Sequence, residues 1–122
     1  MKKILFIEDE SALQRAVAAV LGGEGFSVVS AVSGTEGLEL ARKELPDLIL
    51  LDLILPEKDG FAVLEELKKD PATACIPVII MSNLEGTEDV QKALERGATM
   101  YLVKMNYKLE EVVEKIKNVL GR

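Results

Sequence analysis

The sequence predicts an α/β fold in which a five-stranded parallel sheet is flanked by five helices. Five short apolar runs alternate with five amphipathic stretches along the 122 residues. Most of the runs are apolar at nearly every position, which is typical of strands covered on both faces. Strict alternation of strand and helix is typical of a parallel sheet. Hydrophobic residues make up 48% of the chain, and its length fits a single domain over residues 1–122.

The five expected strands are the apolar runs at residues 4–7, 27–30, 48–51, 78–81 and 99–103. The first helix is expected to begin at a capping box of Ser11 and Gln14 and to stop at the glycine pair 22–23. The second is expected to begin at a capping box of Ser33 and Glu36.

The three remaining helices also have start and stop signals. Asp59 and Gly60 open the third, and the Asp-Pro pair at 70–71 closes it. Thr87 is expected to cap the fourth, which ends at Gly97. The fifth carries apolar residues at helical spacing: Leu109, Val112, Val113, Ile116, Val119 and Leu120.

Composition excludes several kinds of function. The net charge of −6 gives no general attraction to phosphate backbones, so we expect no direct binding of nucleic acid. There is no histidine and only one cysteine, Cys75, which excludes His-based acid–base catalysis and most zinc sites. The apolar run at residues 4–7 is too short for an export signal and no run could span a membrane, so we expect a cytoplasmic protein without a membrane partner.

Asp52 is the only polar residue among the eight residues 48–55. An ionised carboxylate buried without a partner costs several kcal/mol, so such a residue implies either compensation or a chemical task. The structural alternative is that Asp52 ends a strand and accepts backbone N–H bonds. Three apolar residues and Pro56 follow it, with no helix start for it to cap, which favours a task.

Other chemically active residues stand at the ends of the remaining strands. Glu8 and Asp9 follow the first, Ser82 the fourth and Lys104 the fifth. In a parallel sheet these ends share the edge where ligands bind. Each residue alone has an ordinary structural explanation, but together they gather three carboxylates, a hydroxyl and an ammonium. Such an oxygen-rich cluster suits Mg²⁺ or Mn²⁺, and a carboxylate there can act as a nucleophile toward a phosphoryl group.

These residues lie in stretches that resemble the receiver domains of two-component response regulators. The matching stretches are residues 4–10 (ILFIEDE), 46–60 (PDLILLDLILPEKDG), 77–82 (PVIIMS) and 97–104 (GATMYLVK). The resemblance covers essentially the whole chain. It implies a flavodoxin-like, doubly wound sheet with strand order 2-1-3-4-5.

The resemblance also implies a role for each site residue. Asp52 would be the phosphoacceptor, with a sensor histidine kinase or a phosphotransfer protein as donor. Asp9 would bind the metal ion directly, Glu8 would bind it through water, and the backbone carbonyl of Ile54 would be a further ligand. The domain would assist its own phosphorylation and dephosphorylation without being an enzyme toward other substrates.

A switch is implied as well. Lys104 would contact the phosphoryl group and Ser82 would follow it. Tyr101 would then change rotamer and alter the face made by the fourth helix, fifth strand and fifth helix, which a downstream effector reads. The structural alternative for Tyr101 is a half-buried aromatic residue that packs on the sheet.

Two departures from the family pattern lie beside the site. Met105 replaces the usual proline after Lys104, so the Lys104–Met105 bond is expected to be trans. Asn83 replaces a smaller residue and would narrow access to the phosphoryl site.

Ile54 and Leu84 would flank the phosphoryl group and restrict the access of water to it, which predicts slow autodephosphorylation.

Alternatives remain open at this point. One is a pseudo-receiver that docks on partners without phosphorylation. Another is an aspartyl-phosphate phosphatase of the haloacid-dehalogenase type, although Ile54 stands where its second acid is needed. A third is a flavin-binding relative of flavodoxin, although Glu8 and Asp9 stand where its phosphate loop would begin.

The chain is expected to be a monomer or a weak phosphorylation-dependent dimer. We favour a solvated surface over a dimer face for the charged residues Glu88, Asp89, Lys92, Glu95, Arg96 and Lys108.

Overall fold

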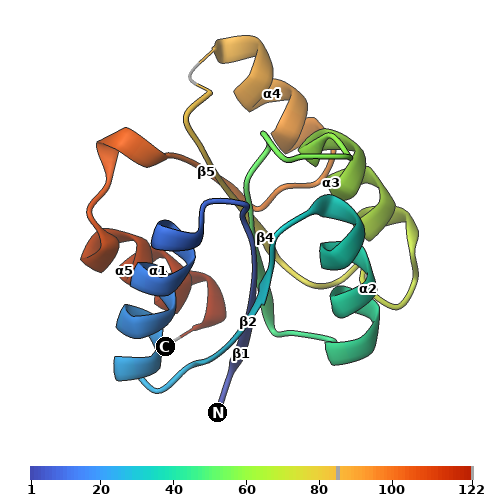
Figure 1. Ribbon diagram of the computed structural model, residues 1–122. Coiled ribbons are helices and arrows are strands. Elements are labelled where there is room, and N and C mark those ends of the chain that lie inside the picture. The colour runs from blue at the N-terminus through green and yellow to red at the C-terminus, as the bar shows by residue number, and fades with distance from the viewer. Residues whose placement is uncertain (85, 122) are drawn as a thin grey trace.

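The computed structural model describes residues 1–84 and 86–121. Five strands form one parallel sheet in the order β2-β1-β3-β4-β5, as predicted (Figure 1). The strands are β1 (Lys3–Ile7), β2 (Ser27–Ala31), β3 (Leu48–Leu51), β4 (Val78–Ser82) and β5 (Met100–Val103). The helices are α1 (Ser11–Gly23), α2 (Gly34–Glu44), α3 (Gly60–Lys69), α4 (Thr87–Glu95) and α5 (Leu109–Leu120), with a 3₁₀ turn, η1 (Lys104–Asn106), after β5.

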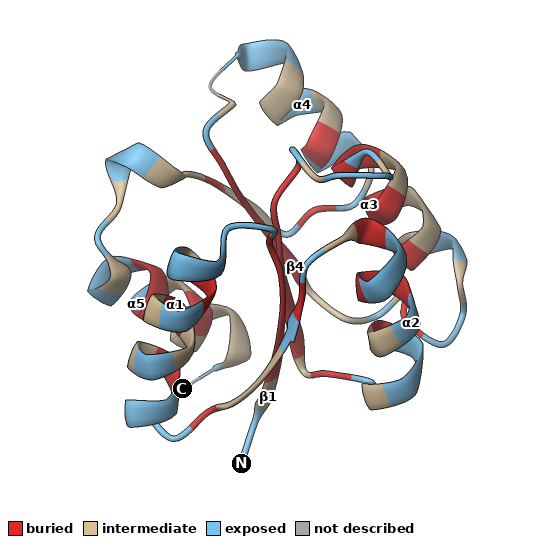
Figure 2. Cartoon of the chain, viewed as in Figure 1, coloured by how far each residue is buried: buried red, intermediate tan, exposed pale blue. Residues whose placement is uncertain are grey.

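The helices cover both faces of the sheet and make two separate cores (Figure 1). On one face, Leu5 and Ile7 of β1 pack with residues of α2, α3 and α4. On the other, Ile4 and Phe6 pack with residues of α1 and α5. Alternate residues of the same strand therefore enter different cores. This explains why β1, β3 and β4 are buried almost throughout and read as continuous apolar runs (Figure 2).

Two predicted helix caps are wrong. Ser11 is the first residue of α1 and Glu10 is its N-cap, which makes no side-chain capping bond. Gln14 forms no capping box because its amide is buried and donates to backbone carbonyls of other segments. Thr87 is likewise the first residue of α4 and not its cap; the N-cap is Gly86.

Ser33 and Asp59 stand at the starts of their helices as predicted, but only one half of the predicted capping box of Ser33 and Glu36 forms. Ser33 is the N-cap of α2 and accepts from the Glu36 N–H at 3.2 Å, while the Glu36 carboxylate accepts from Val32 N rather than from Ser33 N. Asp59 caps α3 by accepting from Phe61 N at 3.0 Å.

Strand and peptide-bond details differ little from expectation. Ser82 is the last residue of β4, whereas Thr99 lies just before β5. Every peptide bond among the described residues is trans, which includes Lys104–Met105. Within the described part of the chain, we find no helix with the length and apolar character needed to cross a membrane.

Candidate functional site

The three predicted carboxylates meet at the carboxyl edge of the sheet. Glu8 follows β1 and Asp52 follows β3, and the pairing of these two strands places them side by side. Glu8, Asp9 and Asp52 each contribute one carboxylate oxygen, and these three atoms all lie within 4.8 Å of one another. Glu8 is 1% exposed and Asp52 is 4% exposed, whereas Asp9 is on the surface. The edge therefore combines two buried acids with one that solvent reaches.

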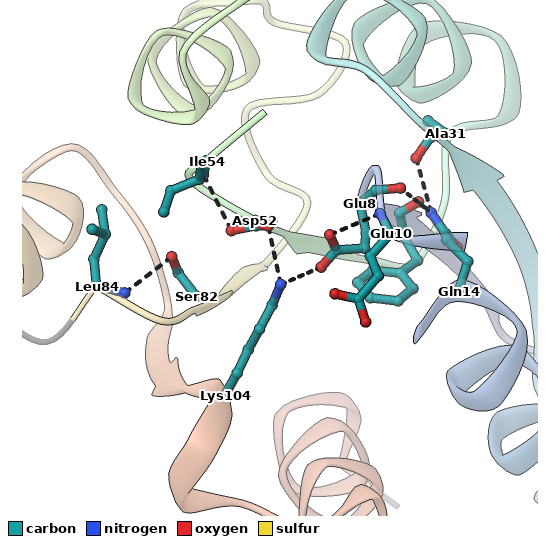
Figure 3. Close-up of polar contacts among 10 residues, drawn as sticks. Glu8, Glu10, Gln14, Ala31, Asp52, Ile54, Ser82, Leu84 and Lys104 are labelled. Atoms are coloured by element: carbon teal, nitrogen blue, oxygen red, sulfur yellow. Dashed lines mark hydrogen bonds and ion pairs between the residues drawn. The ribbon is translucent and has the colours of Figure 1, made fainter. Parts of the chain in front are cut away.

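Lys104 links the two buried acids. Its ammonium lies 2.5 Å from Glu8 Oε1 and 3.1 Å from Asp52 Oδ2, because η1 begins directly after β5 and aims the side chain across the edge (Figure 3). Burial by itself lowers the pKa of Lys104, but the hydrogen bonds to Glu8 and Asp52 outweigh it and the pKa is raised. The ammonium therefore stays charged at neutral pH.

One ammonium does not neutralise the cluster. Burial raises the pKa of Glu8 to about 7, and the negative charge of Asp52 adds to this, while the bond from Lys104 opposes it. Burial and the charge of Asp52 therefore make ionisation of Glu8 unfavourable without a further cation. A divalent cation would stabilise the ionised carboxylates, and a donor set made only of oxygens fits Mg²⁺ or Mn²⁺.

Asp52 is held by three hydrogen bonds. Its backbone N–H donates to Ile7 O at 3.1 Å, which continues the sheet for one residue beyond β3. Its Oδ1 accepts from Ile54 N at 3.1 Å and its Oδ2 accepts from Lys104. The structural expectation that Asp52 accepts a backbone N–H is thus correct, but it accounts for only one of the two carboxylate oxygens.

Ser82 and Tyr101 are connected to each other through the loop after β4. Ser82 is fully buried, and its Oγ accepts from Leu84 N at 3.4 Å. The Tyr101 hydroxyl donates to Leu84 O at 2.8 Å, and its half-buried ring packs against the core that contains α3 and α4. The structure brings Glu8, Asp9, Asp52 and Lys104 together, while Ser82 and Tyr101 form a second group joined by the Leu84 backbone. Figure 3 shows Glu8, Asp52 and Lys104 in contact, with Ser82 and Leu84 beside them.

Gln14 belongs to this region and was missed as a functional candidate by sequence reasoning. Its amide holds the backbone of Glu8, as described below. A signal was available: Gln14 lies on the same helical face as Val17 and Leu21, at spacings of three and seven residues, so a polar side chain stands on the buried stripe of α1.

Comparisons with known proteins agree with this geometry. The family model described as the response regulator receiver domain matches residues 4–117. The transcriptional regulator RpaA of Synechocystis is 38% identical over 122 residues, which are 100% of this chain and 50% of RpaA. The chain spans about half the length, or less, of the curated relatives it matches.

Solved structures extend the similarity to three dimensions. A CheY-like receiver domain protein from Methanospirillum hungatei superposes with a TM-score of 0.92 at 29% identity, covering 99% of this chain and 94% of the other. The Mn²⁺-bound form of the response regulator Rcp1 superposes with a TM-score of 0.85 at 32% identity, covering 97% and 93%. Together with the family match, these similarities show that the chain belongs to the receiver domains of two-component response regulators, a family of phosphorylation-dependent signalling switches.

Proposed function

We propose that Asp52 accepts a phosphoryl group from the phosphohistidine of a sensor histidine kinase or phosphotransfer protein. The observation that carries the proposal is a buried carboxylate bonded to Lys104 and surrounded by two further acids. A carboxylate oxygen of Asp52 forms the new O–P bond, the P–N bond of the donor breaks, and its electron pair stays on the imidazole nitrogen. The chain has no histidine, so the donor is another protein or domain.

The residues that would hold a metal ion are Glu8, Asp9, Asp52 and the backbone carbonyl of Ile54. The raised pKa of Glu8 and the oxygen-only donor set support Mg²⁺ or Mn²⁺ as the ion. Bound there, the cation would offset the charge of the carboxylates and of the phosphoryl group. Lys104 would offset further negative charge, and its bonds to Glu8 and Asp52 keep its ammonium beside the nucleophile.

The response to phosphorylation would pass through Ser82 and Tyr101. A phosphate adds roughly −1.5 to −2 charge at the edge of the sheet, which attracts hydroxyl donors. The Ser82 hydroxyl would leave Leu84 N and follow the phosphoryl oxygens. Because Leu84 O also accepts from Tyr101, this movement would release or reset the Tyr101 ring and alter the face of α4, β5 and α5. A downstream effector protein or domain would read that face.

The remaining expectations are part of the same proposal. Residues 1–122 would act as one receiver domain in the cytoplasm, without direct contact to nucleic acid or membrane. The domain would assist its own phosphorylation and dephosphorylation rather than turn over other substrates. It would be a monomer or a weak phosphorylation-dependent dimer.

Intact-mass measurement with acetyl phosphate and Mg²⁺ tests the proposal. The wild-type chain should gain the mass of one phosphoryl group, and Asp52→Asn should gain none because an amide is a poor nucleophile. Asp59→Asn is a matched control, since asparagine caps a helix as well as aspartate does. No gain by wild type would instead support the pseudo-receiver, and an equal gain by Asp52→Asn would place the nucleophile elsewhere.

A further inference from the structure

Gln14 lies in the first turn of α1, and its side chain points back toward the ends of β1 and β2 (Figure 3). It is only 7% exposed. Its Nε2 lies 3.0 Å from the carbonyl oxygen of Phe6, 2.9 Å from that of Glu8 and 2.9 Å from that of Ala31. Three carbonyl oxygens around one atom identify that atom as the amide nitrogen, because an amide oxygen cannot donate.

These bonds fix the turn that carries the acids. The carbonyl of Glu8 belongs to the peptide that joins Glu8 to Asp9, and the Gln14 amide ties this peptide to α1. The N-cap of α1, Glu10, makes no side-chain capping bond that would hold the turn from the helix side. Because the Glu8 and Asp9 side chains start on either side of the tied peptide, its orientation affects the directions of both carboxylates. The Glu8 carboxylate is held in addition by the Glu10 N–H, which donates to Oε2 at 3.2 Å, and by Lys104.

The other end of the Gln14 amide argues against a role in packing alone. Among the described residues, Gln14 Oε1 is buried and has no hydrogen-bond partner. A buried acceptor without a partner is unfavourable, and an apolar side chain of similar length would fill the same space without it. The donor half of the amide must therefore supply something that packing alone would not.

We infer that Gln14 is a positioning residue for the divalent cation, holding the Glu8–Asp9 peptide so that both carboxylates face Asp52. This inference rests on the metal site of the proposed function. Gln14 would act through the backbone and would touch neither the cation nor the phosphoryl group. Groups that orient metal ligands in this way commonly change metal affinity 10- to 100-fold when replaced.

The test compares Mg²⁺ affinity with folding stability in four chains. Gln14→Met keeps the length of the side chain and removes its donors, and Gln14→Asn keeps the amide but shortens its reach by one methylene. Thr73→Val is the matched control, because Thr73 is also buried and its hydroxyl donates to a carbonyl, Leu67 O at 2.7 Å, away from the acids. Calorimetric titration with MgCl₂ gives the dissociation constant of each unphosphorylated chain, and urea unfolding gives its stability.

We expect Gln14→Met to weaken Mg²⁺ binding about tenfold or more and Gln14→Asn to weaken it less. Thr73→Val should lose stability but bind Mg²⁺ within about twofold of wild type. Wild-type affinity in both Gln14 variants, with or without a loss of stability, would overturn the inference and leave the metal site intact. If Gln14→Met does not fold, Gln14→Asn decides the question. No Mg²⁺ binding by wild type would overturn the metal site itself, and the inference with it.

Discussion

At the scale of single residues, the site is a balance of charge around two buried acids. Lys104 contacts both Glu8 and Asp52, yet the pKa of Glu8 is still raised to about 7 by burial and by the charge of Asp52. Ionising Glu8 is therefore less favourable in the folded chain than in the unfolded one. This makes the stability of the domain depend on pH and on divalent cations.

We predict that, without divalent cations, the free energy of unfolding falls as the pH rises from about 5 to 7.5. Between 4.5 and about 7, the folded chain holds a proton on Glu8 that the unfolded chain has released, so a rise in pH favours unfolding. The fall should be on the order of 2 kcal/mol, and Mg²⁺ should reverse it by binding the ionised site. Urea unfolding at several pH values measures it.

Glu8→Gln is the control for this prediction, because it removes the titrating group. Three other acids have lowered pKa values: Glu44 through its bond from Lys3, Glu65 through its bond from Arg96, and Asp70 through its bonds from Ala72 N and Arg42. They therefore change stability at lower pH, and do so in both chains. The difference between wild type and Glu8→Gln therefore isolates Glu8. Parallel pH profiles in the two chains would contradict the prediction.

We also predict that the phosphorylated chain loses its phosphoryl group slowly. The Ile54 side chain is 57% exposed beside Asp52, and Leu84 lies in the loop bonded to Ser82 and Tyr101. Both are apolar and give an attacking water no hydrogen-bond partner. Replacing both by asparagine should shorten the phosphoryl lifetime severalfold, followed by intact mass after removal of acetyl phosphate. Leu45→Asn is a matched control, since Leu45 is 56% exposed and lies outside the site. An unchanged lifetime in the double variant would refute the idea.

At the scale of the elements, the approach of α3 to the end of β3 shapes the nucleophile loop. Gly60 begins α3, and its N–H donates to Leu53 O at 3.0 Å. A Cβ at Gly60 would lie 2.4 Å from Leu53 Cα and 2.6 Å from Asp52 O, and both are backbone atoms. Only glycine therefore allows the helix to start this close to Asp52.

Gly60→Ala should destabilise the domain by about 1–3 kcal/mol, because backbone cannot move aside as a flexible side chain can. It should also slow phosphorylation by acetyl phosphate, since the displaced backbone carries Asp52. Gly22→Ala provides the opposite case: nothing lies within 4 Å of a Cβ there, and alanine favours the helix by up to ~1 kcal/mol. Urea unfolding of the two variants should give shifts of opposite sign, and equal shifts would contradict the steric explanation.

At the scale of the whole molecule, the face of α4, β5 and α5 is charged but partly engaged within the chain. The Lys92 ammonium lies 4.2 Å from the centre of the Phe61 ring, and Arg96 Nε donates to Glu65 Oε1 at 2.7 Å. Two of the cations on this face are thus directed toward α3. Both cations are therefore engaged within the chain.

We therefore predict that the unphosphorylated chain sediments as a monomer at micromolar concentration. Acetyl phosphate and Mg²⁺ should produce at most a weak, reversible dimer, and Asp52→Asn should show none. Sedimentation velocity of the two chains, with and without acetyl phosphate, makes the comparison. A stable dimer before phosphorylation would show that the face is an interface in its own right.

Much of this molecule follows from local patterns in its sequence. The apolar runs predicted five buried strands, their alternation with helices predicted a parallel sheet, and parallel strands must bring their carboxyl ends to one edge. That Glu8, Asp9, Asp52 and Lys104 share one edge of the sheet follows from that topology alone. The strand order came from the resemblance to a family, because hydrophobic periodicity does not specify which strands are neighbours.

The tertiary structure decided what each polar side chain does at that edge. Ser11 and Gln14 have the spacing of a capping box, but Gln14 instead donates to carbonyls of β1, β2 and the Glu8 turn. Spacing along the chain shows which groups can meet within one helix, whereas hydrogen bonds and charge interactions depend on distances between segments far apart in sequence. The burial of Glu8, its contact with Lys104 and the role of Gln14 could therefore appear only once the sheet and its helices were packed together.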